Sequence, residues 1–498
     1  MFKRILIANR GEIACRIMAT CQEMGIDTVA VYSEADAAAA HVLAADRAIG
    51  LGAADPAASY LNQARILGAA RETGAEAIHP GYGFLAENAA FAARCEDAGV
   101  TFIGPPPAAI RDLGDKTVAR RLMAASDVPV IPGLQRAETD PRKLVAEAER
   151  VGYPVLVKAA AGGGGKGMRV VASPDELAAA AAAAGREAAA AFGDGSIYIE
   201  KYLPRARHVE FQVLADTHGH CIHLLERECS IQRRHQKIVE ETPSPALTPG
   251  LREAMGKAAV RAARAAGYVN AGTVEFLLDA DGRFYFLEVN TRLQVEHPIT
   301  EMITGIDLVR EQIRIAAGRP LAFEQTDVAA RGHAIECRIY AEDPANNFIP
   351  APGPIDYLKV PQGPGIRIDS GIYAGGQVPV EYDPILAKLV VRAQDRAAAI
   401  ARMRRALKEF VILGVRTPIA YLRDLLDHEA FRAGATFTDF IPRHMADWSP
   451  AGRAPEMAAL AYIVDDLTGG APAGTRRATV SAASPTPWQT LGAWRPSF

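Results

Sequence analysis

Several signatures that would place this sequence in a class are missing. Only six cysteines occur in 498 residues; they are scattered and form no CxxC pair, so no disulfide framework is expected. No apolar stretch approaches the ~20 residues that span a bilayer. The first apolar run is too short for a secretory signal and indicates a strand instead. We therefore expect a cytoplasmic protein that does not enter a membrane.

An excess of charge of one sign is also missing. Lys plus Arg total 55 and Asp plus Glu total 58, so the formal net charge is −3. A nearly neutral chain offers no basic field for a nucleic-acid backbone, and nucleic acid is not an expected partner. The hydrophobic share of 49% is ordinary for a folded globular chain. The length predicts about three domains.

The N-terminal region predicts a doubly wound α/β domain. Short apolar runs at Ile5–Ala8, Thr28–Tyr32, Ala77–His79 and Thr101–Ile103 alternate with helical patterns, as buried parallel strands do. The first turn, Asn9-Arg10-Gly11-Glu12, lacks the pattern G-x-G-x-x-G. A dinucleotide-binding fingerprint is therefore absent.

One cluster of histidines and cysteines has the composition of a zinc site. The two interpretations are zinc ligation and a turn between strands at Val209–Leu214 and Cys221–Leu225. The sequence Asp-Thr-His-Gly-His is typical of a turn, so we favour the hairpin. The residues concerned are His218, His220, Cys221, His223 and Cys229.

A glycine run follows a predicted strand. Lys158 ends the apolar run that starts at Pro154, Gly162–Gly165 and Lys166 follow, and a second apolar run begins after Gly167. Consecutive glycines leave backbone N–H groups free to surround an anion, and lysines add cationic contacts to phosphate oxygens. The spacing is not that of a Walker A loop. We interpret the segment as a hairpin that covers phosphate groups, the alternative being a glycine linker.

Polar side chains alternate along a second predicted hairpin and beyond it. The strands at residues 273–279 and 284–289 bring Glu275 beside Glu288. Because side chains alternate along an extended chain, we expect one face to carry Glu288, Asn290, Arg292, Gln294 and Glu296. Glu275, Glu288 and Asn290 offer the oxygen ligands that Mg²⁺ prefers. Arg292 can hold an anion and Glu296 can take a proton beside it, the alternative being a solvated edge strand.

Together these segments resemble the ATP-grasp ligases, and specifically the biotin carboxylase component of biotin-dependent carboxylases. The matching segments follow family order over residues 3–445. They are Leu6–Ile13, His79–Asn88, Gly114–Lys116, Lys158 with the glycine run, Glu200–Leu203, Arg207–Glu210, Glu226–Lys237, Glu288–His297, Gly332–Arg338 and Tyr382-Asp-Pro.

The resemblance implies a multidomain fold of the α/β and α+β classes. The expected parts are an N-terminal doubly wound α/β domain over residues 1–112, a central ATP-grasp domain over 113–330 with a mobile lid at about 131–204, a C-terminal biotin carboxylase domain over 331–446 and a tail over 447–498.

The resemblance also implies roles for individual residues. ATP would be bound by Lys116, Lys158, Gly162, Gly163, Gly164, Gly165, Lys166, Met168, Glu200, Lys201, Leu203, His208, Gln232 and His235. Mg²⁺ or Mn²⁺ would be held by Glu275, Glu288 and Asn290, and bicarbonate by Arg292, Gln294 and Val295. Glu296 would deprotonate bicarbonate and Lys237 would steady phosphoryl charge. Arg338 would stabilise the biotin enolate, with Tyr82 in a loop that faces biotin.

The implied reaction is the ATP-dependent carboxylation of biotin by bicarbonate through carboxyphosphate, the first half-reaction of a multisubunit acyl-CoA or pyruvate carboxylase. Bicarbonate is a weak nucleophile, so a base improves its attack on the γ-phosphoryl group. Carboxyphosphate is fragile, so a closing lid should exclude water. The final acceptor stays open among acetyl-CoA, propionyl-CoA, another acyl-CoA and pyruvate.

Two other functions are weighed against this one. Another ATP-grasp ligase, such as a carbamoyl-phosphate-forming enzyme, would resemble two copies of the core, and a second copy is absent from the sequence. A non-catalytic nucleotide-binding regulatory subunit would have lost Glu296, Arg292 or a metal ligand, and all of these residues are present.

The C-terminal tail is uneven in composition. No lysine follows Lys408 and no Met-Lys-Met tripeptide occurs. Because biotin attaches to a lysine, we expect a separate biotin carboxyl carrier protein and a separate carboxyltransferase subunit, with a homodimer implied by the resemblance. The three tryptophans are Trp448, Trp488 and Trp494. Since aromatic anchors dominate interfaces, Trp488 and Trp494 could dock such a partner; the alternatives are that they fold back onto the enzyme or stay disordered.

Overall fold

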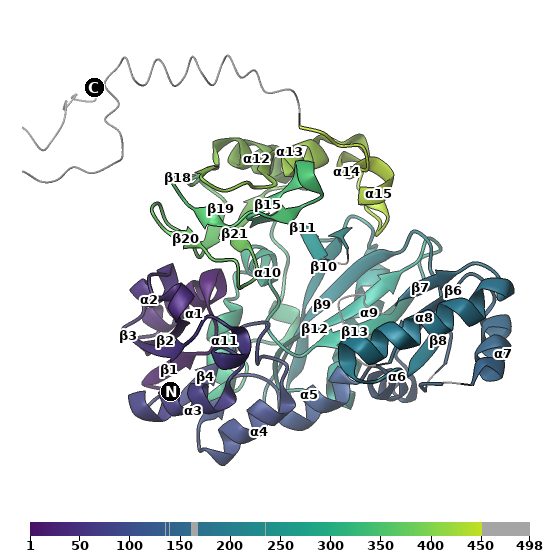
Figure 1. Cartoon of the computed structure of the whole chain (residues 1–498), viewed down its shortest axis with the longest axis horizontal. Coiled ribbons are helices and arrows are strands. Elements are labelled where there is room, and N and C mark those ends of the chain that lie inside the picture. The colour runs from purple at the N-terminus through teal and green to yellow at the C-terminus, as the bar shows by residue number, and fades with distance from the viewer. Residues whose placement is uncertain (135, 139, 161–167, 235, 451–498) are drawn as a thin grey trace, which may run out of the picture. The chain divides into compact units, whose positions relative to one another are not determined.

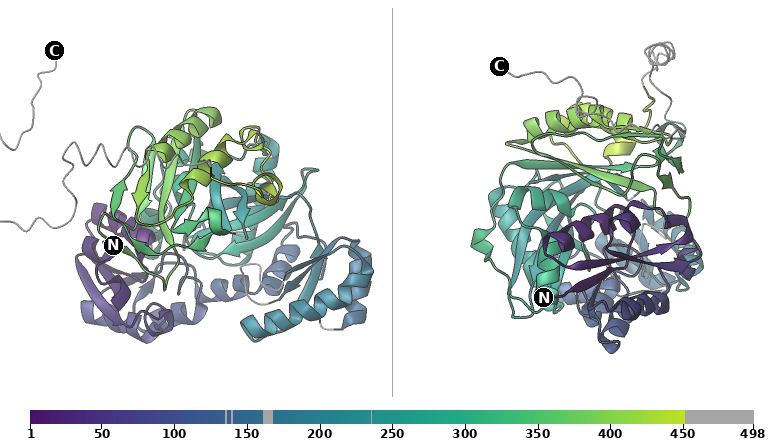
Figure 2. Two further views of the ribbon diagram at one scale, coloured as in Figure 1. Left: turned by 45° about the horizontal axis from the view of Figure 1, so that its top comes forward. Right: turned by 90° about the vertical axis from the view of Figure 1, so that its left-hand side faces the viewer.

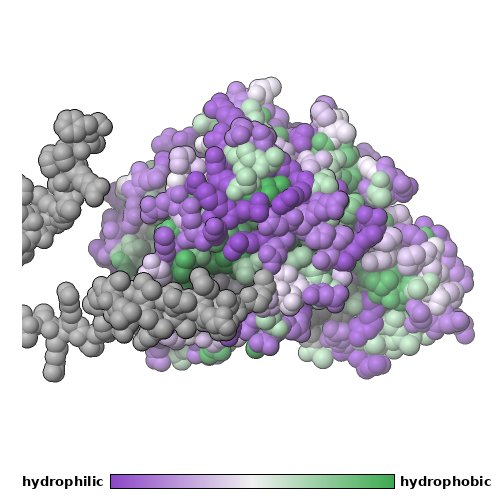
Figure 3. Space-filling view, turned by 90° about the horizontal axis from the view of Figure 1, so that it is seen from above, coloured by the Kyte–Doolittle hydropathy of each residue, from purple (hydrophilic) through white to green (hydrophobic). Residues whose placement is uncertain are grey.

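The computed structural model describes residues 1–450 apart from 135, 139, 161–167 and 235 (Figure 1). The chain divides into two compact units, Met1–Ser449 and Pro450–Phe498, and every element named below belongs to the first. Among the described residues, no helix combines the length and the apolar character needed to cross a membrane. The face seen in Figure 3 is mostly hydrophilic, with hydrophobic residues in small separate groups.

Five parallel strands form the N-terminal sheet in the order β3-β2-β1-β4-β5. They are β1 (Arg4–Ile7), β2 (Asp27–Ser33), β3 (Arg47–Gly52), β4 (Ala77–His79) and β5 (Thr101–Phe102), and the helices that accompany them are α1 (Gly11–Glu23), α2 (Ala40–Ala44), α3 (Gln63–Thr73) and α4 (Ala89–Asp97). Helices lie on both faces of this sheet (Figure 2), so its central strand is buried on both sides. The predicted doubly wound α/β domain is confirmed.

The strand β3 was not predicted from the sequence. Arg47–Gly52 lies at the edge of the sheet, and only Leu51 within it is buried. An edge strand pairs on one side and needs no continuous apolar run. Gly50 and Gly52 weaken the strand pattern further.

The strand order reverses between β1 and β4, and the loops that follow these two strands lie side by side. The backbone N–H of Ala8 donates to the carbonyl of His79 at 2.9 Å. The Asn9 side-chain amide donates to the carbonyls of Pro80 and Tyr82, both at 2.7 Å. In open α/β sheets, ligands bind at the carboxyl ends of strands at such a reversal. The loop that carries Tyr82 is therefore fixed where a substrate is expected.

An antiparallel sheet of eight strands runs through the centre of the unit in the order β13-β12-β9-β10-β11-β14-β21-β19. Its strands are β9 (Arg207–Ala215), β10 (Cys221–Arg233), β11 (Gln236–Thr242), β12 (Asn270–Leu278), β13 (Phe284–Asn290), β14 (His333–Tyr340), β19 (Ile366–Ser370) and β21 (Ile385–Ala393). All its pairings are antiparallel. Because β11 pairs with β14, strands on either side of the expected boundary at residue 330 belong to one sheet.

The hairpin of β9 and β10 confirms the predicted turn between these two strands. The Asp216 carboxylate accepts hydrogen bonds from the backbone N–H groups of His218 and His220 at 2.8 and 3.0 Å. His220 Nδ1 lies 2.9 Å from the same carboxylate, and His218 Nε2 lies 3.0 Å from the carbonyl of Gly318. Within the described part of the chain, the possible metal-binding groups contain none of His218, His220, Cys221 and His223, whereas Cys229 lies in one group with Glu210 and Glu296.

The segment expected to form a lid has an apolar core of its own. Its sheet has the order β7-β6-β8, with β6 (Val155–Ala159), β7 (Arg169–Val171) and β8 (Ile197–Lys201), and its helices are α7 (Pro141–Val151) and α8 (Pro174–Phe192). The core of this segment includes Leu144, Val157 and Ile199. β6 and β7 are antiparallel neighbours on either side of the glycine run, as predicted. The run itself, residues 161–167, lies outside the described residues.

The other helices cover the large sheet and complete the unit. They are α5 (Pro107–Gly114), α6 (Lys116–Ala125), α9 (Pro249–Ala265), α10 (His297–Thr304), α11 (Leu308–Ala316), α12 (Arg396–Glu409), α13 (Ile419–Asp427), α14 (Glu429–Arg432) and α15 (Phe440–His444). Short strands are β15 (Glu342–Asp343), β16 (Ile349–Pro350), β17 (Gly353–Pro354), β18 (Tyr357–Lys359), β20 (Gln377–Val378) and β22 (Val411–Leu413).

Trp448 packs against the C-terminal part of this unit. Its ring lies 5.1 Å from the ring of Tyr421, edge to face, and its indole N–H donates to Asp424 at 2.8 Å. Trp448 thus contributes to the packing of α13. Trp488 and Trp494 lie outside the described residues.

The buried carboxyl group of Glu228 should make the stability of the fold depend on pH. Its carboxylate is buried, accepts a hydrogen bond from Ser244 Oγ at 2.6 Å and another from Ser230, and lies 3.8 Å from Arg207. Burial raises the pKa of Glu228 from 4.5 to about 7. Between pH 4.5 and about 7, the folded state therefore keeps a proton that the unfolded state releases. The free energy of unfolding consequently falls as the pH rises through this range.

We expect Glu228→Gln to remove this fall in the free energy of unfolding, which for the full pKa shift is on the order of 3 kcal/mol. Urea denaturation at pH 5, 6, 7 and 8 measures it, with exposed Glu253→Gln as the matched control. A pH dependence in Glu228→Gln equal to that of the unsubstituted protein would contradict the prediction.

Candidate active site

A row of charged side chains crosses four neighbouring strands of the large sheet. Glu288 on β13 stands directly opposite Glu275 on β12, Glu275 opposite Glu210 on β9, and Glu210 opposite Arg227 on β10. Directly opposed residues share one face of a sheet, and like charges in such pairs repel. The row therefore needs cations to balance three carboxylates.

Lys237 on β11 supplies a central cation. Its ammonium group lies 2.5 Å from Glu210 Oε2, 2.8 Å from Glu275 Oε1 and 2.7 Å from Glu296 Oε1. Burial opposes the charge on this lysine, but the three carboxylates outweigh it and hold the pKa of Lys237 well above its ordinary value. Lys237 thus joins the acidic row to the segment that carries Glu296.

Arg227 anchors the other side of Glu210. It is fully buried, and its Nε donates to Glu210 Oε1 at 2.6 Å. Its remaining donors reach Gln212, Thr300 and Thr273 at 2.8, 3.0 and 3.0 Å. Glu210 and Arg227 were not assigned roles from the sequence, although both lie in segments that carry the resemblance. Only the pairing of β9 with β10 and β12 shows that they adjoin the site.

Glu288 differs from the other carboxylates of the row. Among the described residues it has neither a hydrogen-bond nor an ion-pair partner. Burial and the nearby charge of Glu275 raise its pKa, while Lys116 and Lys158 oppose that rise. Asn290 Nδ2 donates to Glu275 Oε1 at 2.7 Å. The three side chains predicted to bind a divalent cation are thus gathered on one face of β12 and β13.

The structure corrects the predicted conformation of the segment after Asn290. β13 ends there, residues 291–296 are not in a strand, and Glu296 is the N-cap of α10 with φ −81° and ψ 10°. The expected alternation along one extended strand is therefore wrong beyond Asn290. Pro298 lies in the first turn of α10, where proline favours a helix start, and this signal was available in the sequence.

The turn nevertheless brings the predicted side chains together. Arg292 donates to Asn290 Oδ1 at 3.0 Å and to Gln294 Oε1 at 3.1 Å, and Gln294 donates to Glu275 Oε1 at 3.2 Å. Glu87, from the N-terminal domain, accepts from Arg292 Nε at 2.8 Å and from the backbone of Thr291 at 3.1 Å. The sequence did not single out Glu87, although it lies in the matching segment His79–Asn88.

Glu296 lies between two cations. Arg338 on β14 donates to Glu296 Oε2 at 2.8 Å, while Lys237 holds Oε1. Burial alone would raise the pKa of Glu296, but Lys237 and Arg338 hold it well below the ordinary value. The carboxylate is consequently ionised at neutral pH.

Arg338 has a second acidic partner. Its Nε donates to Glu240 Oε1 at 2.6 Å, and Glu240 stands opposite Glu336 on β14. Burial raises the pKa of Glu240 to about 7 and that of Glu336 well above its ordinary value. Neither carboxyl group was predicted from the sequence. Their proton uptake limits the negative charge that Arg338 must balance.

The predicted nucleotide-binding side chains form two groups. Lys158 and Glu200 share one face of the lid sheet, where Lys158 Nζ lies 2.8 Å from Glu200 Oε1, and Arg120 holds the other oxygen at 3.2 Å. Lys116 begins α6, and burial lowers its pKa. In the second group, His208 Nε2 lies 3.0 Å from Glu275 Oε2 and its Nδ1 lies 2.8 Å from Gln232.

Other predicted nucleotide contacts are placed differently or not described. Lys201 follows Glu200, so its side chain lies on the opposite face of β8 and donates to the carbonyls of Gly152 and Tyr153 at 2.8 and 3.1 Å. Met168 directly precedes β7 and Leu203 follows β8, both half-buried. The residues outside the described part are Gly162, Gly163, Gly164, Gly165, Lys166 and His235.

Tyr82 and Val295 have hydrogen-bond partners on elements outside the row of charged side chains. The Tyr82 hydroxyl donates to Glu12 on α1. The Val295 carbonyl accepts a hydrogen bond from Lys388 on β21 at 3.0 Å. The predicted biotin and bicarbonate residues thus contact different parts of the chain.

Comparisons with known proteins agree with this architecture. Three family models match: "Biotin carboxylase, N-terminal domain" over residues 1–110, "Carbamoyl-phosphate synthase L chain, ATP binding domain" over 115–324 and "Biotin carboxylase C-terminal domain" over 336–443. The order of the three models is that of the N-terminal sheet, the central region and the C-terminal region.

Curated relatives and solved structures cover most of the chain. A pyruvate carboxylase subunit of Methanothermobacter thermautotrophicus is 55% identical over 89% of this chain and 90% of that protein. Biotin carboxylase 1 of Bacillus subtilis is 53% identical over 89% and 98%. The biotin carboxylase domain dimer of the 2-oxoglutarate carboxylase of Hydrogenobacter thermophilus, solved with MgADP, ADP and bicarbonate, has a TM-score of 0.86 at 48% identity and covers 90% of this chain and 99% of its own. The chain therefore belongs to the biotin carboxylase family.

Proposed function

We propose that this chain carboxylates biotin on a separate carrier protein, using ATP and bicarbonate, with carboxyphosphate as the intermediate. The observation that carries the proposal is the position of Glu296. This ionised carboxylate is held by Lys237 and Arg338, beside the paired carboxylates Glu275 and Glu288. A proton acceptor, a cation for phosphoryl charge, a cation for an enolate and a divalent-metal site adjoin one another.

ATP would bind between the lid and the large sheet. Lys116 and Lys158 lie close enough to Glu288 for their charges to lower its pKa. Both would contact phosphate oxygens, and the glycine run would supply backbone N–H groups. His208 and Gln232 would line the nucleotide site on the other side of Glu275. Mg²⁺ or Mn²⁺ fits the oxygen donors of Glu275, Glu288 and Asn290, because Glu288 is a half-buried carboxylate without a hydrogen-bond or ion-pair partner among the described residues. Such a cation would neutralise charge on the transferring phosphoryl group.

Bicarbonate would bind at the turn between β13 and α10. Arg292, Gln294 and the backbone around Val295 would hold it, with Arg292 kept in place by Glu87. A carboxylate with a strongly lowered pKa is a poor base. When an anionic substrate draws Lys237 and Arg338 toward itself, their hold on Glu296 weakens and its pKa rises. Substrate binding thereby converts Glu296 into the proton acceptor.

The remaining steps can be written with atoms balanced. A bicarbonate oxygen attacks the γ-phosphorus, the bond from phosphorus to the ADP oxygen breaks, and Lys237 stabilises the charge that develops. Carboxyphosphate then divides into CO₂ and phosphate, which takes the proton from the biotin ureido nitrogen. Arg338 stabilises the resulting enolate-like anion, and the nitrogen attacks CO₂.

The related activities are less well supported by the site. The model for a carbamoyl-phosphate synthase matches only the ATP-binding region, which two kinds of ligase share, whereas the flanking domains match biotin carboxylase. A regulatory subunit without catalysis would not need Glu296 in a balanced cluster with Lys237 and Arg338.

The partners follow from the same proposal. We infer a biotin carboxyl carrier protein and a carboxyltransferase as separate chains, and a homodimer within a larger complex in the cytoplasm. One relative is named for pyruvate and one solved structure for 2-oxoglutarate, so relatedness alone does not select the acceptor. A carboxyltransferase bound to this chain would decide it.

The activity itself is the first test. Purified protein should cleave ATP in the presence of bicarbonate and magnesium, and free biotin should increase the rate. Phosphate release with and without each substrate measures this. Intact nucleotide binding with no stimulation by biotin would contradict the proposal.

Replacing Glu296 tests the role of the base. Glu296→Gln should keep ATP binding but lower turnover by about 10²–10⁴-fold, because a positioned base contributes that much. Titration with ATP and steady-state phosphate release separate the two effects, and Glu253→Gln on the exposed face of α9 is the matched control. Near-normal turnover would exclude Glu296 as the base.

The tail gives a separate prediction. Removing residues 450–498 should leave turnover on free biotin unchanged, while co-purification with the carrier or carboxyltransferase should weaken. The full chain with Trp488→Ala and Trp494→Ala should reproduce the loss if these aromatic side chains are the anchors. If both variants co-purify with the partner as the unsubstituted chain does, the partner must bind to another part of the chain.

A further inference from the structure

A fully buried ion pair joins the first turn of α1 to the middle of β21. Lys388 Nζ lies 3.0 Å from Glu12 Oε2, and neither side chain is exposed. The two residues come from opposite ends of the described chain and from the N-terminal and C-terminal domains. Asp369 on β19 lies 3.7 Å from the same ammonium group. A buried pair of this kind is costly to desolvate, so it often adds little net stability compared with apolar side chains of similar volume.

Each member of the pair also contacts a predicted substrate-binding element. Glu12 accepts the hydrogen bond of the Tyr82 hydroxyl with its other oxygen. Lys388 donates to the carbonyl of Val295, which directly precedes Glu296. A continuous chain therefore runs from Tyr82 through Glu12 and Lys388 to Val295. It connects the loop expected to face biotin with the segment expected to hold bicarbonate.

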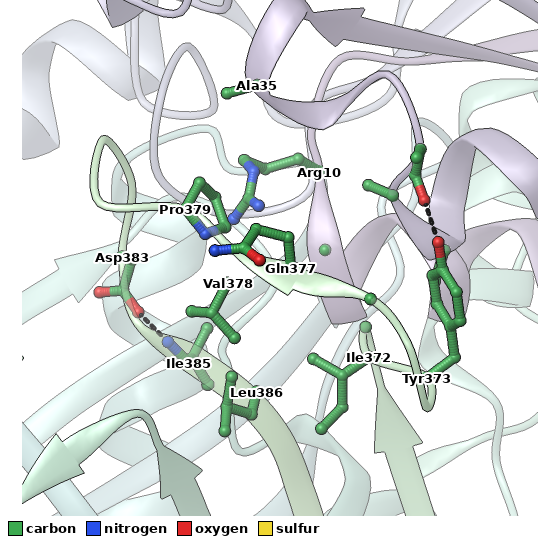
Figure 4. A pocket seen from close by; sticks show the side chains of 16 residues that line it. Arg10, Ala35, Ile372, Tyr373, Gln377, Val378, Pro379, Asp383, Ile385 and Leu386 are labelled. Carbon is green, nitrogen blue, oxygen red and sulfur yellow. Dashed lines mark hydrogen bonds between the residues drawn. The ribbon is translucent and has the colours of Figure 1, made fainter. Parts of the chain in front are cut away.

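A close backbone contact fixes the same end of α1. A Cβ at Gly371, just after β19, would lie 2.5 Å from the backbone nitrogen of Glu12. Only glycine permits this approach. Figure 4 shows the cavity beside the contact, with Arg10 on one side and Ile372, Val378 and Leu386 on the other. Gly11 and Gly371 also line it. The C-terminal domain thus holds Glu12 through its backbone as well as through its carboxylate.

We propose that Glu12 and Lys388 are positioning residues that set the distance between biotin and the CO₂ released beside Glu296. This inference rests on the proposed function. The carboxyl group must pass between two substrates held by different domains, and reacting atoms need to approach to about 3–3.5 Å. A buried charge pair defines that spacing more strictly than apolar packing, because ionic and hydrogen-bonding geometry is directional. If the spacing is lost, CO₂ escapes and ATP is cleaved without carboxylation.

The test is the double variant Glu12→Gln/Lys388→Met, which removes both charges and nearly preserves side-chain volume. We expect kcat/KM for biotin to fall by about 10²-fold. KM for ATP should stay within about threefold, and bicarbonate-dependent ATP cleavage without biotin should fall less than kcat/KM for biotin. The ratio of phosphate released to carboxybiotin formed should rise. A role confined to folding would not change that ratio selectively.

Two further variants keep the proposal falsifiable. Glu12→Gln alone retains hydrogen bonding and should show the same uncoupling in milder form even if the double variant is unstable. The control is Arg10→Met/Asp36→Asn, which removes a partly buried ion pair that lies within the N-terminal domain and contacts neither Tyr82 nor Val295. Thermal unfolding establishes that each variant is folded.

The outcomes are distinguishable. The positioning role would be overturned if the Glu12 variants kept both the normal ratio of phosphate released to carboxybiotin formed and the normal kcat/KM for biotin. An equal rise of this ratio in the control Arg10→Met/Asp36→Asn would also overturn it. If the unsubstituted protein itself shows no biotin-stimulated ATP cleavage, the proposed function fails, independently of any variant.

Discussion

The balance of buried charge around Lys237 is the interaction on which the site depends. Glu210 and Glu275 stand opposite each other on neighbouring strands and would repel without a cation between them. Lys237 contacts both and also Glu296, while Arg227 compensates Glu210 from the other side. The position of each catalytic candidate is therefore set by the others. Such a network is stable only when all its members are present.

The same charge balance would make the basicity of Glu296 depend on whether substrate is bound. In the described state, Lys237 and Arg338 keep Glu296 ionised and weakly basic. Anionic substrates would compete for these two cations and so increase the basicity of the carboxylate only when it is needed. Glu12 and Lys388 extend the network of buried charges beyond the central cluster, since they connect Val295 at its edge with the N-terminal domain.

Much of the fold followed from local patterns in the sequence. Strands of the N-terminal sheet are buried on both faces, and their continuous apolar runs were sufficient to locate four of them. β3 carries no such run because it pairs on one side only. At residues 288–296 the chemical composition of the site was predicted, but its backbone was not: side-chain alternation cannot distinguish an extended strand from a turn that leads into a helix. The proline after His297 was the more informative signal.

The sequence by itself determined which residue types are available and where hairpins and glycine runs occur, because these depend on neighbours a few positions apart. The tertiary structure decided which of them meet. Glu87 with Arg292, Arg338 with Glu296, and Glu12 with Lys388 are contacts between distant segments. Their geometry is set by the register of the large sheet and by the packing of α1 against it. No local pattern encodes that register, so the buried partners that hold the catalytic side chains became visible only in three dimensions.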